Sequence, residues 1–275
     1  MLVLTAAAGV PDAVTEDVAR GRPWRRLAAT AVEIDADGVP ADVDLSEVDV
    51  NRVPDAGRRK RMLIADMDST IIGVECIDEL ADFAGVKAQV AAITELAMRG
   101  ELDFEAALDA RVATLRGLPD EVLEACYSER VRLNPGARTL VRTMAALGAD
   151  TALVSGGFTF FTERVAAAAG FAWNRANVLD VVDGRLTGTV VRPILGRAAK
   201  LAALREGAAR AGISAADVIA VGDGANDLDM VEAAGLGVAY HAKPALAARA
   251  DARIVHSDLT ALLALQGIPE ADWVR

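Results

Sequence analysis

The sequence predicts an α/β fold built on a parallel sheet, and three observations point to it. From residue 137 onward, short apolar runs alternate with segments of helical periodicity, which is typical of a parallel sheet with helices on its faces. An earlier apolar run, Met62–Ala65, indicates a buried strand that ends in carboxylates. A purely helical block separates these two regions. We therefore predict a Rossmann-like parallel-sheet core with an inserted helical cap, after a small N-terminal α/β segment.

Residues 1–60 are predicted to form the N-terminal α/β segment and a linker. The expected elements are a strand at Met1–Val10, a helix at Asp12–Arg20, a strand at Ala28–Ile34 and a helix or strand at Asp42–Val48. Asp49–Lys60 contains a proline, a glycine and a basic cluster, so we interpret it as the linker. Nothing in this segment has catalytic spacing, and a role in ligand sensing or oligomerisation stays open.

The helical cap is predicted over about residues 75–132. Cys76–Ala84 has apolar residues at helical spacing, and Gly85 follows as a typical helix end. Three further helices are expected at Ala88–Met98, Asp103–Leu115 and Pro119–Arg130.

The second domain is predicted over residues 61–275, with the cap inserted into it. Its strands are expected at Met62–Ala65, Thr151–Val154, Ala176–Val182, Asp217–Val221, Leu236–Tyr240 and Arg253–His256. Its helices are expected at Arg138–Leu147, Thr159–Ala169, Arg197–Ala211, Asp227–Ala234 and Ser257–Leu265. Asp183 and Gly184 form a turn signal before Arg185–Val191, which predicts a hairpin there.

Composition narrows the classes of function. The chain has 275 residues, of which 53% are hydrophobic and 25% charged, so it can bury a substantial core. A formal net charge of −11 argues against nucleic-acid and anionic-membrane partners. No apolar run approaches the ~18 residues of a membrane span. Cys76 and Cys126 are expected to be two buried thiols, which favours a cytoplasmic protein.

Asp66 and Asp68 are the candidate catalytic residues at the end of the Met62–Ala65 strand. Two buried carboxylates this close are costly, because like charges repel and burial penalises both. A divalent cation would offset that cost, and hard oxygen ligands suit Mg²⁺. The alternative is an ordinary strand followed by a capped turn.

Further polar features follow other predicted strands, and the carboxyl ends of parallel strands meet at one edge of a sheet. Ser155, Gly156 and Gly157 offer a hydroxyl and accessible backbone N–H groups to an anion. Lys200 offers a positive charge, and Asp223 and Asp227 offer carboxylates for a metal. The two histidines, His241 and His256, have no neighbouring cysteine, so neither a zinc site nor a catalytic triad is expected.

These strings resemble the haloacid dehalogenase superfamily of aspartate-based phosphohydrolases, over about residues 61–260. The resemblance is carried by Asp66-Met-Asp-Ser-Thr, Ser155-Gly-Gly-Phe-Thr-Phe-Phe, Lys200 and Gly222-Asp-Gly-Ala-Asn-Asp. Glu75-Cys-Ile-Asp-Glu-Leu, Met98-Arg-Gly-Glu-Leu-Asp-Phe, Arg111-Val-Ala-Thr-Leu and Ala239-Tyr-His-Ala-Lys-Pro resemble the branch that acts on phosphoserine. Residues 1–61 are shorter and less recognisable than the regulatory extensions of some relatives, which leaves allosteric control open.

The resemblance implies roles for the residues of the predicted core. Asp66 would be the nucleophile, and Asp68 would be the general acid and then the general base. Asp66, the backbone carbonyl of Asp68, and Asp223 would hold Mg²⁺. The groups that would bind or approach the phosphoryl oxygens are those of Ser155, Gly156, Lys200 and Asn226. Gly157 and Asp227 would support the site.

The resemblance also implies roles for residues of the cap. Glu75 would pair with the substrate ammonium, and Arg111 would bind its carboxylate in a bidentate manner. Met98 and Phe104 would close the apolar side of the pocket.

The expected function is that of a phosphoric monoester hydrolase. It would convert O-phospho-L-serine to L-serine and phosphate through an aspartyl-phosphate, as the last step of serine biosynthesis. We expect a small-molecule substrate and neither nucleic acid nor membrane as a partner, and homodimer formation stays open. One alternative is a phosphatase or phosphotransferase for another amino-acid phosphate, such as phosphohomoserine. The other is a non-catalytic module that binds phosphoamino acids, against which the intact Asp66 and Asp68 argue.

Overall fold

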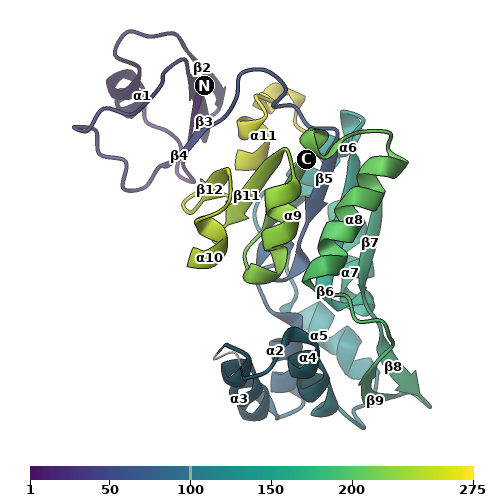
Figure 1. The fold of residues 1–275 in the computed structure, drawn as a ribbon. Coiled ribbons are helices and arrows are strands. Elements are labelled where there is room, and N and C mark those ends of the chain that lie inside the picture. Colours follow the sequence, from purple (N-terminus) through teal and green to yellow (C-terminus); the bar gives the residue numbers. More distant parts are fainter. Residues whose placement is uncertain (99–100) are drawn as a thin grey trace.

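The computed structural model describes residues 1–98 and 101–275 and contains three sheets. Figure 1 shows the N-terminal module (residues 1–52) at one end of the molecule and a group of helices, the cap, at the other. The large parallel sheet with its flanking helices, which we call the core, lies between them. Within the described residues, no helix is long and apolar enough to cross a membrane.

The core sheet has six strands in the order β12-β11-β10-β5-β6-β7, and all neighbours are parallel. Its strands are β5 (Met62–Ala65), β6 (Asp150–Phe158), β7 (Trp173–Asn177), β10 (Val218–Gly222), β11 (Leu236–Tyr240) and β12 (Ala252–Ile254). The predicted parallel sheet is therefore confirmed. Strand β5 is central, with Ile64 opposite Ala220 of β10 and Ala152 of β6. Strand order reverses beside β5, which is where an α/β sheet opens a crevice for a ligand.

Helices cover both faces of this sheet. Leu63 of β5 packs in the apolar cluster that includes α6 (Ala137–Ala146), α7 (Thr159–Ala169) and α11 (Ala261–Leu265). On the other face, Met62 and Ile64 pack against α8 (Arg197–Arg210) and α9 (Leu228–Ala233). The short helix α10 (Pro244–Ala247) follows β11. Because β5 is buried on both faces, its sequence is a continuous apolar run rather than an alternating one.

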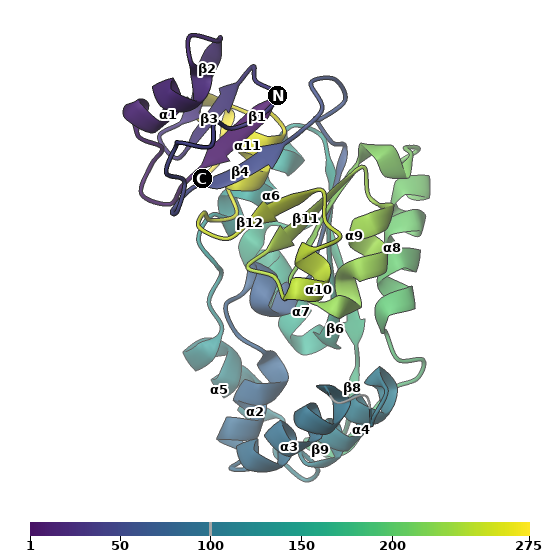
Figure 2. The same ribbon diagram turned by 60° about the vertical axis from the view of Figure 1, so that its left-hand side comes forward.

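The cap consists of α2 (Cys76–Phe83), α3 (Lys87–Met98), α4 (Phe104–Ala113) and α5 (Glu121–Arg130). Asp103 begins α4 by accepting a hydrogen bond from the Ala106 N–H at 2.8 Å. The hairpin of β8 (Leu179–Val182) and β9 (Arg185–Val190) extends from the core and lies beside α4 (Figure 2). Backbone hydrogen bonds join it to the cap, from Gly117 N–H to the Leu186 carbonyl and from Leu186 N–H to the Leu118 carbonyl.

Two predicted elements near the core differ from the structure. The strand expected at Ala176–Val182 is divided into β7 and β8, because the chain leaves the core sheet after Asn177 and enters the hairpin. Ser155, Gly156 and Gly157 were expected after a strand, but they lie inside β6, which continues to Phe158. The pairing of β6 with β7 shifts register between Val154 and Phe158, so the site residues sit on an irregular part of the strand.

The N-terminal module is an antiparallel sheet in the order β2-β3-β1-β4 with one helix. It comprises β1 (Leu2–Thr5), α1 (Asp12–Ala19), β2 (Trp24–Ala28), β3 (Ala31–Ile34) and β4 (Asp49–Arg52). Strand β4 occupies the start of the segment that was predicted to be the linker, so that prediction is wrong for Asp49–Arg52. Strand β2 was not predicted. The expected helix or strand at Asp42–Val48 is also wrong. There the Ser46 N–H bonds the Asp44 carboxylate at 3.0 Å, a local turn that competes with regular structure.

Two polar side chains of β4 attach the module to the core. Asn51 donates to the Arg253 carbonyl at 2.9 Å and accepts from the Arg253 N–H at 2.7 Å, as a neighbouring strand would. The Asp49 carboxylate accepts from the N–H groups of Val255, His256 and Ser257 at 2.8–3.1 Å. These contacts explain why β12 ends at Ile254 and not at the predicted His256. The outer edge of the core sheet is thereby covered.

Candidate active site

Asp66 directly follows β5 and is only 3% exposed. Its partner is Lys200 of α8, whose ammonium lies 2.6 Å from Asp66 Oδ1 and 2.6 Å from Asp227 Oδ1. Burial, together with the nearby charge of Asp227, raises the pKa of Asp66, while Lys200 opposes that rise. Burial alone would lower the pKa of Lys200, but the two carboxylates raise it above its ordinary value. Lys200 is therefore a permanent positive charge beside Asp66.

Three carboxylates gather at the ends of β5 and β10. Oxygen atoms of Asp66, Asp223 and Asp227 all lie within 4.8 Å of one another. Asp227 is held by the N–H groups of Asp223 and Gly224, at 3.2 and 3.1 Å from its Oδ2. Burial raises the pKa of Asp223 to about 6, although Lys243, 3.5 Å away, lowers it. Converging hard oxygen ligands with excess negative charge fit a divalent cation.

Asp68 follows Asp66 by two residues, and its side chain is not part of the cluster of Asp66, Asp223 and Asp227. Its Oδ1 accepts from the Cys76 N–H at 3.0 Å and its Oδ2 from the Ser155 hydroxyl at 3.3 Å. Burial, with the negative charge of Glu75, raises the pKa of Asp68 to about 6. A carboxyl group with this pKa can exchange protons near neutral pH.

The Ser155–Gly157 segment brings backbone close to Asp68. The Ser155 hydroxyl also accepts from the Gly157 N–H at 2.8 Å. A Cβ at Gly157 would lie 2.7 Å from Asp68 Oδ2, so only glycine fits beside the carboxylate. The buried Asn177 amide donates to the Gly156 carbonyl at 2.8 Å and so holds this segment in place. Asn177 was missed from the sequence, although it also lies at a strand end.

The cap contributes the remaining predicted residues. The Glu75 carboxylate accepts from the Ser69 hydroxyl at 2.7 Å. Arg111 is partly buried, and its Nε donates to the Ala107 carbonyl at 3.2 Å. Burial lowers the pKa of Arg111, and Asp78, Glu75 and Asp68 oppose that change. The Phe104 ring approaches Gly156, where a Cβ would meet it at 3.1 Å.

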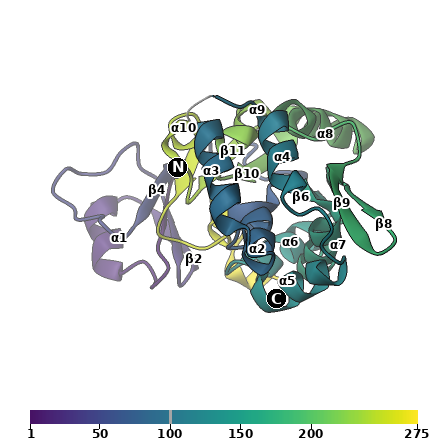
Figure 3. The same cartoon turned by 90° about the horizontal axis from the view of Figure 1, so that it is seen from below.

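A cavity of about 400 Å³ lies between core and cap and unites these residues. Figure 3, seen from the cap side, shows α3 and α4 in front of the core. The predicted residues that line the cavity are Asp66, Asp68, Glu75, Phe104, Arg111, Ser155, Gly156, Gly157, Asp223 and Asn226. Lys200 and Asp227 are buried behind its wall, and the Met98 side chain lies outside the described part of the chain.

The sequence analysis missed other lining residues, namely Ile77, Thr94, Leu108, Phe158, Ala225 and Lys243. Lys243 could have been found, because it follows β11 and the strand-end argument applies to it. The apolar residues and Thr94 carry no comparable local signal.

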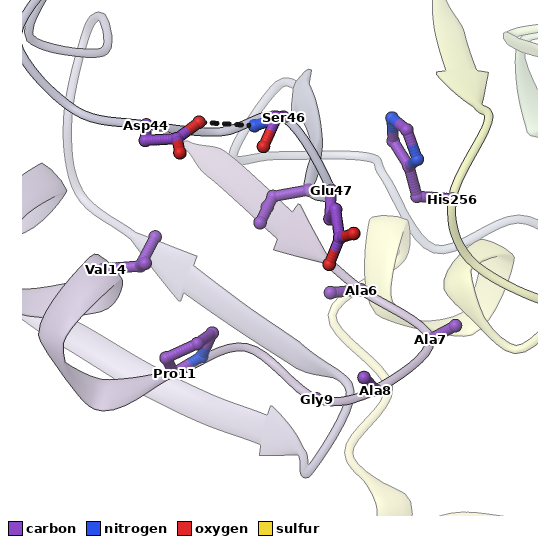
Figure 4. A pocket seen from close by; sticks show the side chains of 11 residues that line it. Ala6, Ala7, Ala8, Gly9, Pro11, Val14, Asp44, Ser46, Glu47 and His256 are labelled. Carbon is purple, nitrogen blue, oxygen red and sulfur yellow. Dashed lines mark hydrogen bonds between the residues drawn. The ribbon is translucent and has the colours of Figure 1, made fainter.

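Two other cavities lie towards the N-terminal module. A groove of about 790 Å³ shares Asp223 and Lys243 with the site and continues past His241 and His256 to Ala7. A hollow of about 490 Å³ in the module is lined by Ala6–Gly9, Asp44, Glu47 and His256, among others (Figure 4). None of the predicted site residues lines this second cavity.

Comparisons with known proteins agree with this geometry. Residues 63–232 match the family model of haloacid dehalogenase-like hydrolases. Phosphoserine phosphatase SerB2 of Mycobacterium tuberculosis is 48% identical over 217 residues, which are 79% of this chain and 53% of that protein. Phosphoserine phosphatase of Streptococcus thermophilus is 47% identical over 200 residues, which are 73% of this chain and 93% of that protein. The chain thus spans about half the length of the first relative and most of the second.

Among solved structures, a probable phosphoserine phosphatase from Vibrio cholerae in unliganded form is similar over nearly the whole chain. The TM-score is 0.81 at 33% identity, and the match covers 98% of this chain and 87% of that one. The likeness therefore includes the N-terminal module as well as the core and cap.

Proposed function

The chain belongs to the haloacid dehalogenase-like hydrolase family, and on this premise we propose that it is a Mg²⁺-dependent phosphatase for O-phospho-L-serine. The products would be L-serine and phosphate. The observation that supports this best is the composition of one cavity. Its core side carries carboxylates and the Ser155–Gly157 strand segment, while its cap side carries Glu75 and Arg111. Groups for a phosphate, an ammonium and a carboxylate thus face the same space.

Phosphatases of this family generally use a divalent metal, and we propose Mg²⁺ here. Asp66, Asp223 and the backbone carbonyl of Asp68 would hold it, with Asp227 supporting the loop. When bound, the ion would supply positive charge that reduces repulsion between a carboxylate nucleophile and a phosphate dianion.

In the proposed mechanism, the Asp66 carboxylate attacks phosphorus and forms an aspartyl-phosphate. Asp68, with its pKa raised to about 6, gives a proton to the serine oxygen as the P–O bond breaks. The Asp68 carboxylate then takes a proton from a water molecule, whose oxygen attacks phosphorus. The bond between phosphorus and the Asp66 oxygen breaks, which releases phosphate and restores the Asp66 carboxylate. Lys200, whose ammonium lies 2.6 Å away, favours the ionised form of Asp66 before the attack and holds its orientation.

Other residues of the site would bind substrate. Ser155, Gly156, Lys200 and Asn226 would contact the phosphoryl oxygens. Glu75 would bind the ammonium and Arg111 the carboxylate, with Phe104 packing over Gly156 on the apolar side.

A phosphate-release assay over a panel of phosphomonoesters, with and without Mg²⁺, tests the proposal. We expect phosphoserine to be the best substrate, and activity to be lost in EDTA. Asp66→Asn should bind phosphoserine but release no phosphate, because it keeps the size of the side chain and removes the nucleophile. Wild-type turnover by Asp66→Asn would exclude the covalent mechanism.

Arg111→Ala tests the assignment of the amino-acid end. Losing one partner of a buried charge pair costs roughly 2–5 kcal/mol, so kcat/KM for phosphoserine should fall about 30-fold to several thousandfold. p-Nitrophenyl phosphate lacks the carboxylate, so its turnover should change much less. Equal losses on both substrates would mean that Arg111 supports the fold or the chemistry instead.

The cellular setting is proposed on the same basis: a cytoplasmic enzyme in the last step of serine biosynthesis, with homodimer formation open. Rescue of a serine auxotroph that lacks its own phosphatase tests the step in serine biosynthesis. Sedimentation analysis of the purified protein tests dimer formation.

A further inference from the structure

Thr94 is a cavity residue to which neither the sequence motifs nor the proposed mechanism gives a role. It lies in α3 of the cap and lines the same cavity as Glu75, Phe104 and Arg111. Its hydroxyl oxygen is buried, yet it has no hydrogen-bond partner within the described structure. Buried hydroxyl groups are usually satisfied, so this one needs a physical explanation.

The helix itself would normally satisfy such a group. A threonine inside a helix usually donates its hydroxyl to the carbonyl four residues earlier, which here would be that of Val90. Thr94 makes no such bond. Leaving a buried hydroxyl unpaired destabilises the folded protein, because the group has lost its hydrogen bonds to water and has gained none in return. A residue that lines a ligand cavity and carries an unsatisfied hydroxyl group is a candidate ligand contact.

We propose that the Thr94 hydroxyl binds the carboxylate of the amino-acid phosphate and so helps to determine specificity. This inference rests on the proposed function. Arg111 is the cationic group on the cap side of the cavity lining, and its Nε is already engaged by the Ala107 carbonyl. A carboxylate has about four acceptor sites and can take a further donor beside the remaining guanidinium N–H groups. Glu75 already supplies negative charge for the ammonium.

The test is Thr94→Val, which keeps the shape of the side chain and removes the hydroxyl. A hydrogen bond to a charged group contributes substantially to the binding free energy. Losing it should lower kcat/KM for phosphoserine roughly 10- to 150-fold. The same loss is expected with 3-phosphooxypropionate, which keeps the carboxylate and lacks the ammonium. Phosphoethanolamine and p-nitrophenyl phosphate, which lack the carboxylate, should be affected less than threefold. Thr94→Ser should retain most of the wild-type preference.

Thermal unfolding gives an independent readout. Without substrate, Thr94→Val should unfold at a temperature equal to or above that of the wild type, because an unpaired buried hydroxyl is removed. Thr162→Val is the matched control. The Thr162 hydroxyl is buried in α7 and paired with Asn174 at 2.9 Å, so this variant should lose stability and keep the substrate ratios.

The outcomes separate this inference from the proposed function. If the wild type does not hydrolyse phosphoserine, the proposed function fails. If the wild type does so and Thr94→Val leaves all substrate ratios unchanged, only the role of Thr94 is overturned. A loss confined to phosphoserine and phosphoethanolamine would assign the hydroxyl to the ammonium and would also overturn it.

Discussion

At the scale of single residues, the site brings together buried carboxylates whose negative charge is only partly neutralised. Asp66, Asp223 and Asp227 bring three carboxylates together, and Lys200 is the one fully buried ammonium described beside them. Lys243 compensates Asp223 only from an exposed position 3.5 Å away. The cluster therefore keeps excess negative charge, and burial makes that charge costly. The raised pKa values of Asp66 and Asp223 are the result.

This cost predicts how stability depends on pH in metal-free protein. Burial raises the pKa of Asp223 to about 6, so between about pH 4 and 6 the folded state binds more protons than the unfolded state. The free energy of unfolding should then fall as pH rises through this window and stay lower above it. Asp223→Asn removes this titrating group. The difference in free energy of unfolding between the variant and the wild type should therefore favour the variant by up to about 3 kcal/mol more at pH 7 than at pH 4. Urea unfolding of both proteins at each pH measures this difference.

Magnesium supplies the control for that prediction. At pH 7 the ion should stabilise the wild type by binding only the folded state, and it should stabilise Asp223→Asn much less. If wild type and variant show the same pH dependence and the same response to Mg²⁺, Asp223 is neither a strained carboxylate nor a ligand.

At the scale of elements, β6 is unusual because it runs through the site and does not end before it. Gly157 lies on this strand against Asp68, where a Cβ would be 2.7 Å from a carboxylate oxygen. The backbone at Gly157 thus limits where the proposed acid can lie, and the Asn177 hydrogen bond to the Gly156 carbonyl holds that backbone in place.

Gly157→Ala should therefore damage chemistry more than folding. Displacing Asp68 by about 1 Å should lower kcat by roughly 10²-fold, with a smaller change in KM. Gly38→Ala is the control, because a Cβ there meets nothing within 4 Å. Steady-state kinetics with circular dichroism of both variants measure the two effects. Unchanged kcat in Gly157→Ala would show that the Asp68 position is not critical.

Elements also show where prediction from the sequence succeeds and fails. Met62–Ala65 was predicted residue for residue, because an apolar run buried on both faces needs no knowledge of its neighbours. The meeting of the candidate residues at one edge of the sheet was predicted from the parallel sheet alone, because the carboxyl ends of parallel strands lie at the same edge. Strand β4 was missed because its polar residues, Asp49 and Asn51, bind backbone some 200 positions away in the chain. Asn177 and Thr94 were missed because their surroundings arise only when distant elements pack.

At the scale of the whole molecule, the N-terminal module and the core are joined by buried polar contacts as well as apolar ones. Val3, Leu27 and Val53 of the N-terminal region share an apolar cluster with α11 (Figure 2). Asp49 adds acceptors for three consecutive backbone N–H groups of the core. The module is therefore expected to unfold together with the core.

Asp49→Ala tests this coupling. Removing the acceptor leaves the buried N–H of Ser257 and the part-buried N–H groups of Val255 and His256 unpaired, which should lower the free energy of unfolding by about 2–4 kcal/mol. Asp44→Ala, which loses only an exposed local hydrogen bond, should stay within about 0.5 kcal/mol. Denaturant unfolding followed by tryptophan fluorescence, to which Trp24 of the module and Trp173 and Trp273 outside it contribute, measures both. Equal stabilities for the two variants would show that the attachment contributes nothing.

The groove of about 790 Å³ has a practical consequence for inhibitor chemistry. It reaches Asp223 and Lys243 from the side of the N-terminal module, without passing beneath the cap. A compound placed there could engage the proposed metal ligand without imitating an amino-acid phosphate. Ala7 and His256 line the far end of the groove and would contact such a compound. Such a compound would act without competing for the groups proposed to bind the substrate's amino-acid end.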